Sequence, residues 1–147
     1  MKLSTKGRYG TRALLDVALH QEDSPVQLKV IAQRQQISLH YLEHIIAPLI
    51  AAGLLRSTRG AYGGVSLGKA PQEIVLSEVI QVLEGSITPV ECVDDPNVCS
   101  RANICVTRDV WTDVKKAMAG VLESVTLQDL VERQKDKQKL ASAMYYI

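Results

Sequence analysis

The sequence predicts a mainly α-helical protein with a small β-wing, organised as a winged helix-turn-helix followed by a long C-terminal dimerisation helix. Two observations predict this fold class. Residues 28–67 read as a helix, a short turn, a second helix and a glycine-tipped hairpin. Beyond Val106, apolar residues recur at alternating steps of four and three, which is typical of a helix that packs along another helix.

A first helix is predicted over residues 5–20, because apolar side chains recur there at helical spacing. Its expected buried face holds Tyr9, Ala13, Leu14, Val17 and Ala18. Basic residues gather at its beginning, where they oppose the helix dipole: Lys2, Lys6, Arg8 and Arg12. We expect the phosphates of a DNA backbone to neutralise the positive charges of Lys2, Lys6 and Arg8. The alternative is an ordinary solvated helix end.

The helix-turn-helix is predicted from a helix over residues 28–35 and a second helix that begins at Leu39, with Ser38 placed to cap it. The apolar side chains of the second helix are expected to face inward: Leu39, Leu42, Ile45, Ile46, Leu49 and Ile50. Pro48 lies inside this helix, where it removes a backbone hydrogen bond. We therefore expect a kink beyond the first turns.

The outer face of the second helix is predicted to enter a DNA major groove, since a recognition helix places its N-terminal residues against base edges. The residues expected to contact DNA there are Ser38, His40, Tyr41, Glu43 and His44. His40 and His44 lie one turn apart and could also bind a metal ion, but no third ligand is apparent, and groove contacts are favoured. A second alternative is a protein-binding module whose outer face is merely solvated.

The hairpin that follows is the predicted wing. Segments 54–59 and 65–67 are joined by the glycine-rich residues 60–64, several of which can take positive φ at little cost. The wing carries Arg56 and Arg59. We expect Arg59 to contact a phosphate or a minor groove.

Charge is unevenly distributed, although the net charge of the 147 residues is only +1. Residues 1–69 hold nine Lys/Arg and four Asp/Glu, a net charge of +5, and residues 70–147 hold eight and twelve, a net charge of −4. The basic half contains the predicted winged helix, as phosphate binding requires.

No catalytic Ser/His/Asp arrangement is evident, and the residues that resemble a phosphate loop end in Ala70 instead of Ser or Thr. The sequence therefore predicts that the protein is not an enzyme.

The chain carries no predicted membrane or secretion segment. No stretch has the roughly 20 apolar residues that span a membrane. The N-terminus lacks the apolar region of a signal peptide. We expect a cytoplasmic protein without a membrane partner, in a compartment that keeps thiols reduced.

Three regions are predicted: a winged helix-turn-helix DNA-binding domain over residues 1–85, a cysteine-bearing loop over 86–105, and a dimerisation helix with a C-terminal helix and tail over 106–147. A short helix is expected over 76–84. The apolar seam of the long helix suits packing against a second copy, or against the winged helix of its own chain. Thr126 and Asp129 resemble a capping box for a last helix to about Lys135. The charged tail is expected to be solvated, and residues 145–147 give no structural prediction.

All three cysteines, Cys92, Cys99 and Cys105, lie in the irregular segment before the long helix, with the spacing C-x6-C-x5-C. An odd number of cysteines in a reducing compartment disfavours a disulfide framework. Thiolates gathered on a polar loop suit a zinc ion or an iron-sulfur cluster, with a fourth ligand from elsewhere. Thiol redox sensing, or no special role, are the alternatives.

Four segments resemble the winged-helix repressor family of the iron-sulfur cluster regulator (IscR): residues 1–10 (MKLSTKGRYG), residues 37–43 (ISLHYLE), the wing residues 59–64 (RGAYGG) and the three-cysteine loop. The resemblance extends to about Leu130. It implies a homodimer through the long helix, two winged helices on a palindromic operator of double-stranded DNA, and a 2Fe-2S cluster on Cys92, Cys99 and Cys105, with 4Fe-4S or zinc less favoured. It also implies repression of genes for iron-sulfur cluster assembly, with cluster occupancy reporting supply, and DNA-facing positions at Tyr41, Glu43 and Arg59.

The sequence departs from this family at the fourth ligand. The iron-sulfur cluster regulator has a histidine three residues after the third cysteine, and that position is Arg108 here, which cannot be a ligand. The nitric-oxide-sensing relative uses an acid at the position of Arg8. Asp109 and Glu91 are the foremost candidates for the ligand, followed by Asp94, Asp95 or a group on the partner subunit. A weakly held oxygen ligand would favour a labile sensor.

Overall fold

The computed structural model describes residues 2–22 and 24–146. Met1, the first residue of the N-terminal motif, Asp23, and Ile147, the last residue of the tail, lie outside the described residues. Seven helices, three 3-10 turns and two strands follow one another in this part of the chain. The helices are α1 (Thr5–His20), α2 (Leu28–Gln35), α3 (Leu39–Ala51), α4 (Leu76–Glu84), α5 (Glu91–Asp94), α6 (Val106–Glu123) and α7 (Leu127–Tyr145). The 3-10 turns are Pro71–Glu73, Pro96–Val98 and Ala102–Ile104.

The wing is a two-stranded antiparallel sheet of β1 (Leu55–Thr58) and β2 (Gly64–Leu67), with Leu55 opposite Leu67 and Thr58 opposite Gly64. Val26 adds an isolated bridge to Val65 on the other side of β2. Gly64 has a φ of +154°, and a Cβ there would lie 2.3 Å from the Val26 carbonyl oxygen. This position therefore requires glycine, because the chain before α2 passes too close for a side chain.

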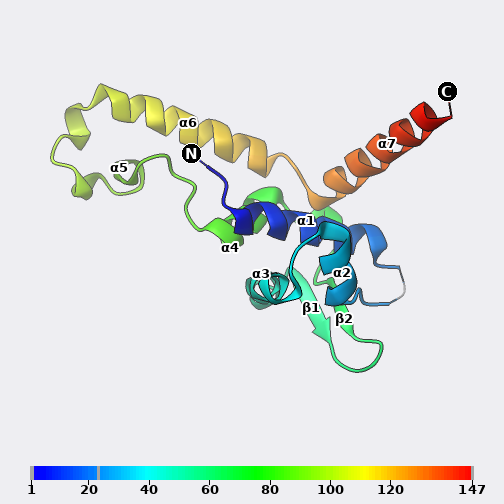
Figure 1. Ribbon diagram of the computed structural model, residues 1–147. Helices are drawn as coiled ribbons and strands as arrows, with labels where there is room; N and C mark the ends of the chain where they lie inside the picture. The colour runs from blue at the N-terminus through cyan, green and yellow to red at the C-terminus, as the bar shows by residue number, and fades with distance from the viewer. Residues whose placement is uncertain (1, 23, 147) are drawn as a thin grey trace.

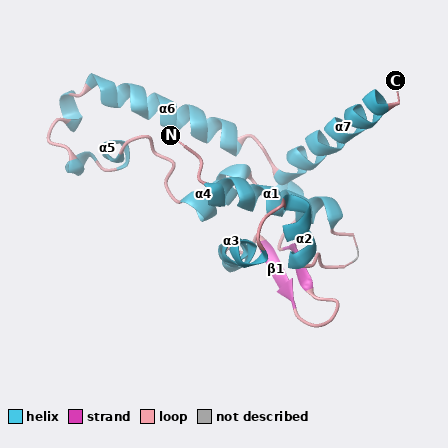
Figure 2. Cartoon of the chain, viewed as in Figure 1, coloured by secondary structure: helices cyan, strands magenta, loops and turns pink. Residues whose placement is uncertain are grey.

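The core lies between α1, α2, α3, α4 and the wing, and the first turn of α7 closes it (Figure 1). The largest fully buried side chains include Leu14 of α1, Ile31 of α2, Ile45 of α3 and Leu127 of α7. Gly10 allows α1 to approach α4 closely, since a Cβ there would lie 2.5 Å from Leu83 Cδ1. The predicted fold class, mainly α with a small β-wing in a winged helix-turn-helix, is confirmed (Figure 2).

The structure differs from the sequence predictions in two elements. Leu39, expected inside, is 41% exposed at the first position of α3. Pro48 lies inside the helix as expected, the helix continues to Ala51, and the kink there stays a prediction. The last helix does not end near Lys135 but continues to Tyr145, since the Glu, Gln, Lys and Arg of this segment are themselves good helix formers.

Helices α6 and α7 leave the core in different directions (Figure 1). α6 begins directly after the cysteine-bearing segment, residues 86–105, which we call the cysteine loop, and packs against α4. Beyond its first two turns, α7 extends away from the body, and residues 135–146 are exposed. Among the described residues, no helix has both the length and the apolar character to cross a membrane.

Candidate DNA interface and cysteine loop

The predicted recognition helix begins at a well-formed cap. Gln36 takes the left-handed conformation, with a φ of 55°, and reverses the chain after α2. Two residues later the Ser38 hydroxyl accepts a hydrogen bond from the Tyr41 N–H at 3.2 Å. Ser38 was predicted to contact DNA, and its position shows that it also fixes the start of α3.

His40, Glu43 and His44 are exposed on the outer face of α3, as predicted. The two histidine rings meet edge to face with their centroids 4.7 Å apart, and their Nε2 atoms lie 3.3 Å apart. Tyr41 is only half-exposed, because its ring and that of Tyr9 from α1 pack in a T-shaped arrangement, at 6.2 Å between centroids. The outer face of α3 therefore offers two imidazoles and a carboxylate, flanked by a partly packed phenol.

The basic beginning of α1 adjoins this face through Tyr9. The guanidinium carbons of Arg8 and Arg12 lie 5.7 and 5.2 Å from the centroid of the Tyr9 ring, within cation–π range. Lys2 and Arg8 are exposed, and Lys6 is half-exposed. Positive charge thus lies one aromatic ring away from Tyr41, at the start of the predicted recognition helix.

Arg59 is exposed immediately after β1, where the chain turns at the tip of the wing. Arg56 also projects from β1, but it donates a hydrogen bond to the Leu67 carbonyl oxygen at 3.4 Å. Of the two, Arg59 is the better placed to meet a phosphate, because Arg56 is directed along the sheet.

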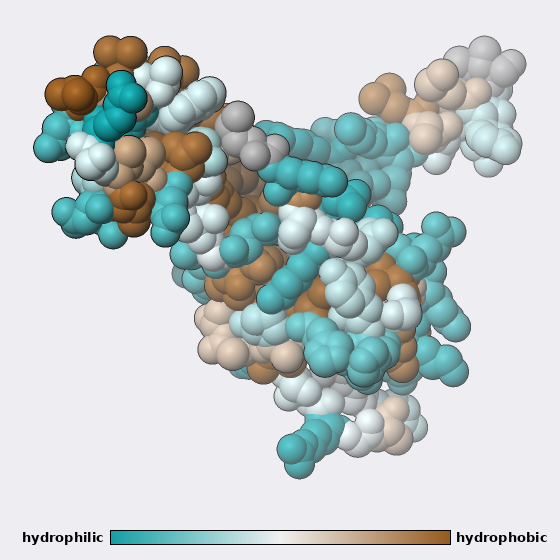
Figure 3. Space-filling view, turned by 60° about the vertical axis from the view of Figure 1, so that its left-hand side comes forward, coloured by the Kyte–Doolittle hydropathy of each residue, from teal (hydrophilic) through white to brown (hydrophobic). Residues whose placement is uncertain are grey.

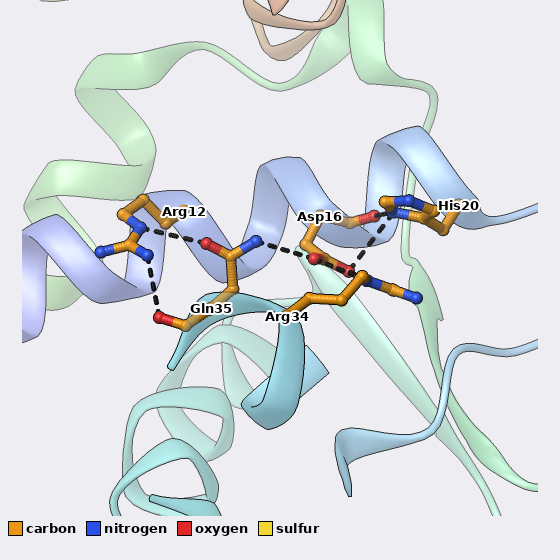
Figure 4. Close-up of polar contacts among 5 residues, drawn as sticks. All are labelled: Arg12, Asp16, His20, Arg34 and Gln35. Atoms are coloured by element: carbon orange, nitrogen blue, oxygen red, sulfur yellow. Dashed lines mark hydrogen bonds and ion pairs between the residues drawn. The ribbon is translucent and has the colours of Figure 1, made fainter. Parts of the chain in front are cut away.

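A buried carboxylate behind this surface was missed by the sequence analysis. Asp16 on α1 is 1% exposed and accepts hydrogen bonds from Arg34 Nε at 3.0 Å and from Gln35 Nε2 at 2.8 Å (Figure 4). Gln35 in turn accepts from Arg12, through its side-chain oxygen at 3.0 Å and its carbonyl oxygen at 2.8 Å. His20 Nδ1 donates to the Asp16 carbonyl oxygen at 2.9 Å.

This network joins α1 to the end of α2, next to the turn that leads into α3. The hydrogen bond to Asp16 raises the pKa of Arg34 above its ordinary value, against the opposing effect of burial. The sequence contained a signal for it: Asp16 shares a helical face with Ala13 and Val17, and a charged residue on an apolar face needs a partner. The partner itself, 18 residues away, was not evident from any pattern.

The three cysteines are free thiols, each half-exposed, in the cysteine loop. The pKa of Cys105 is lowered from its ordinary value, first by a hydrogen bond with the Thr107 hydroxyl and then by the Arg108 N–H. Within residues 2–22 and 24–146, no three His, Cys, Asp or Glu side chains are grouped so that they could hold one metal ion. In the described conformation the three thiols are available as donors, but they are not grouped around a single metal position.

Arg108 has a structural role here. It occupies the position at which the iron-sulfur cluster regulator has a ligand histidine. Its Nε donates to the Cys92 carbonyl oxygen at 2.8 Å and so ties the cysteine loop to α6. Lys115 of α6 forms an ion pair with Asp94 at 2.5 Å, which fixes a second point of the loop. Asp109 and Glu91, the foremost candidates for a fourth ligand, are exposed.

The apolar seam of α6 is not covered by its own chain. No residue of α6, which lies wholly within the described part, is buried. Val110 is 54% exposed and Val121 63%. Figure 3 shows apolar side chains gathered on the lobe that α6 and the cysteine loop form, at the upper left. A groove of about 970 Å³ lies between α6, α1 and α4, lined by apolar residues such as Met118 and Ile80.

Residues 3–133, which include the helix-turn-helix, the wing and the cysteine loop, match the Rrf2 family of iron-dependent transcriptional regulators. The chain belongs to the Rrf2 family. It is similar to the transcriptional regulator CymR of Bacillus subtilis, at 42% identity over all of both chains. It is similar to the transcriptional regulator IscR of Photorhabdus laumondii at 42% identity, over 91% of this chain and 81% of IscR.

Solved structures of Rrf2 proteins share the fold. The structure of IscR from T. potens superposes with a TM-score of 0.78 at 42% identity, covering 94% of this chain and 91% of that one. That of CymR, the global cysteine regulator of B. subtilis, superposes with a TM-score of 0.77 at 43% identity, covering 90% and 98%. Membership of this family confirms that the protein is a DNA-binding transcriptional regulator and not an enzyme. It also confirms the family resemblance predicted from the motifs.

Proposed function

We propose that this Rrf2 protein is a homodimeric repressor that binds a palindromic operator and carries a 2Fe-2S cluster on its cysteine loop. The cluster would report the supply of iron-sulfur clusters, and the repressed genes would include those that assemble them. The observation that carries the proposal is the position of Cys92, Cys99 and Cys105. All three lie in the segment that adjoins α6, the helix with the uncovered apolar seam. A group bound there can influence how two subunits are oriented.

The DNA-binding part of the proposal is supported by the surface around α3. Exposed imidazole and carboxylate groups on α3 can exchange hydrogen bonds with base edges in a major groove. Arg8 and Arg59 flank this face from α1 and from the wing, and backbone phosphates are their natural partners. Two subunits related by a two-fold axis would present two such faces to a palindrome.

The cysteine loop fits an iron-sulfur cluster in its donor atoms. Cys92, Cys99 and Cys105 would hold the cluster, with Asp109 or Glu91 as the candidates for the fourth position. Thiolate is the usual ligand of such clusters. When bound, the cluster would supply a redox-active and labile group. Arg108 would keep Cys92 close to α6. To bind the cluster, the loop would have to bring its three thiols together.

The proposal is tested on protein purified without oxygen. We expect visible absorption from thiolate-to-iron charge transfer, with equal iron and acid-labile sulfide per chain. Replacement of any one cysteine by serine should abolish the absorption. Comparing cluster loss in Asp109→Ala and Glu91→Ala identifies the fourth ligand, and unchanged retention in both excludes them. A protein that stays colourless after attempted reconstitution rules out the cluster.

A second candidate is a thiol-, nitric-oxide- or zinc-responsive repressor on the same scaffold. It is favoured by the three free, half-exposed thiols that are not grouped around one point. The similarity to CymR, the global cysteine regulator of B. subtilis, also agrees with it. Metal analysis separates the candidates: one equivalent of zinc without sulfide indicates a zinc site, and metal-free protein with reversible oxidation of the thiols indicates a redox sensor.

DNA binding is tested by selecting a binding sequence from a random duplex library and measuring its affinity by fluorescence anisotropy. We expect the selected sequence to be palindromic and the affinity to fall steeply with salt. Arg59→Ala and Tyr41→Ala should weaken it. A protein that enriches no sequence and shows no salt-dependent affinity would instead be a protein-binding module built on a winged helix.

A further inference from the structure

His40 and His44 form a pair whose geometry differs from that of two independent groove contacts. They lie at positions i and i+4 of α3 and are both exposed. Their Nε2 atoms are 3.3 Å apart, and the ring planes are at 90°. Each Nε2 atom carries either a proton or a lone pair, so two neutral rings in opposite tautomers share one hydrogen bond. With both protons on Nδ1, the two lone pairs become available to one electrophile.

We propose that His40 and His44 bind a divalent transition-metal ion of the zinc class, and that this ion and DNA exclude each other on α3. Two imidazole nitrogens at about 2.0–2.1 Å from a tetrahedral Zn²⁺ lie about 3.4 Å apart. The observed separation of 3.3 Å therefore matches the spacing that one such ion requires, and the rings need only turn to direct both lone pairs at it. Imidazole is a favoured ligand for zinc, copper and nickel, and a rigid helix fixes the spacing of both rings.

The site is open because only two protein ligands define it. No group of three potential ligands occurs in residues 2–22 or 24–146, so water or a small external ligand would complete the coordination. Such an ion exchanges readily, in contrast to the closed four-ligand sites that are structural. The pair therefore suits a response to free metal ions, not a permanent metal.

Exclusion of DNA follows from where the pair lies. The proposed function places the outer face of α3 in a major groove about 12 Å wide, and a helix with its side chains is about 10–12 Å across. A metal ion with its water ligands on this face leaves no room for base edges. The ion also occupies the two Nε2 atoms that would otherwise donate to or accept from bases. This part of the inference rests on the proposed function, whereas the metal site does not.

The metal site is tested by titrating the reduced full-length protein with zinc alone and following the imidazole resonances of its three histidines by NMR. We expect the Nε2 signals of His40 and His44 to shift together to values typical of coordination. His20 bonds to Asp16 and should not shift. This readout is separate from any zinc at the cysteine loop, because it reports imidazole nitrogen directly. Zinc bound at cysteine only, with both resonances unshifted, overturns the proposal.

Variants quantify the site. Loss of a second-shell partner already costs about 10–100-fold in metal affinity, so His40→Gln or His44→Gln should cost at least as much. Both side chains are exposed, and circular dichroism should show a folded protein in each case. His20→Gln is the matched control and should retain the affinity. Equal zinc affinity in all three variants contradicts a paired site.

The exclusion of DNA is tested with the operator selected as described above. Each protein is compared with itself, with and without zinc. Zinc should reduce the operator affinity of the unaltered protein at least ten-fold and should not change the operator affinity of the His44→Gln protein. An equal reduction in both proteins, or none in either, overturns mutual exclusion. If the metal-free protein binds no DNA at all, the proposed function fails, while the NMR titration still decides whether the metal site exists.

Discussion

Arg34 donates a hydrogen bond from its Nε to a carboxylate oxygen of Asp16, at 3.0 Å, and so joins the last turn of α2 to α1. Asp16 is the one buried charged side chain in the described part of the chain. Such a pair does little for stability compared with apolar residues of the same shape. Its directional bonds do fix where α2 ends and hence where the turn to α3 begins. We infer that the pair contributes more to the position of α3 than to the stability of the fold.

Arg34→Ala should reduce the free energy of unfolding by about 3 kcal/mol, because it leaves a buried carboxylate without its cationic partner. This is the lower end of the range for buried pairs, since the Arg34 side chain is 33% exposed. Urea unfolding followed by circular dichroism measures the loss. Lys69→Ala, which breaks the half-exposed ion pair with Glu78, is the control and should cost less than about 1 kcal/mol, because the Glu78 carboxylate, unlike that of Asp16, is not buried. Equal losses of unfolding free energy in the two variants would mean that the burial of Asp16 does not increase the cost of removing its partner.

Arg59→Ala should weaken operator binding to a similar extent for all sequences and lower the slope of log affinity against log salt by about 0.9, the value for one phosphate contact. The reason is the exposed position of Arg59 at the tip of the wing. Lys137→Ala removes an exposed positive charge from the projecting part of α7 and should leave the slope unchanged. A change of sequence preference without a change of slope would place Arg59 on a base edge instead.

The boundaries of α1, α2 and α4 were predictable because each helix has a strong apolar repeat and an identifiable end. Ser38 as the cap of α3 was predictable for the same reason: its hydroxyl precedes an apolar run and accepts from the Tyr41 N–H. Local signals of this kind depend only on residues within one turn.

The features that sequence reasoning missed depend on residues distant in the chain. Arg34 is paired with Asp16 across 18 positions, and Tyr41 packs on Tyr9 across 32. The length of α7 was underestimated because charged residues suggested a solvated tail, although they also favour helix. The short turns of the cysteine loop have no repeat, since their geometry comes from local caps such as the Asp95 carboxylate on the Asn97 N–H. The assignment of the DNA-contacting residues stays a prediction.

Val121→Asp should convert a dimer to a monomer, because it places a charge on the apolar seam of α6 where Val121 is 63% exposed in the single chain. Size-exclusion chromatography with light scattering measures the mass. Lys116→Asp introduces the same residue on the opposite side of the same exposed helix and should remain dimeric. If both variants stay dimeric, the dimer uses a surface other than this seam.

The docking of α7 onto the body should depend on pH through Asp129. Thr126 N–H donates to the Asp129 carboxylate at 2.8 Å, and Asp129 N–H donates to the Thr126 hydroxyl at 3.2 Å. Thr126 also bridges to Val75, so this cap joins the start of α7 to the chain before α4. The hydrogen bond from the Thr126 N–H, followed by that involving its hydroxyl, lowers the pKa of Asp129 below its ordinary value of 3.8.

A carboxylate with a lowered folded pKa stabilises the folded state fully above the unfolded pKa, and the contribution is lost as pH falls through the folded value. Asp129→Asn should therefore be less stable than the unaltered protein at neutral pH, and the difference should shrink in acid. Thermal unfolding from neutral pH into the acid range measures this. Asp136→Asn, an exposed position further along α7, should show no such convergence. A difference between Asp129→Asn and the unaltered protein that stays constant with pH would show that the cap acts without the negative charge, through hydrogen-bond geometry that asparagine can reproduce only in part.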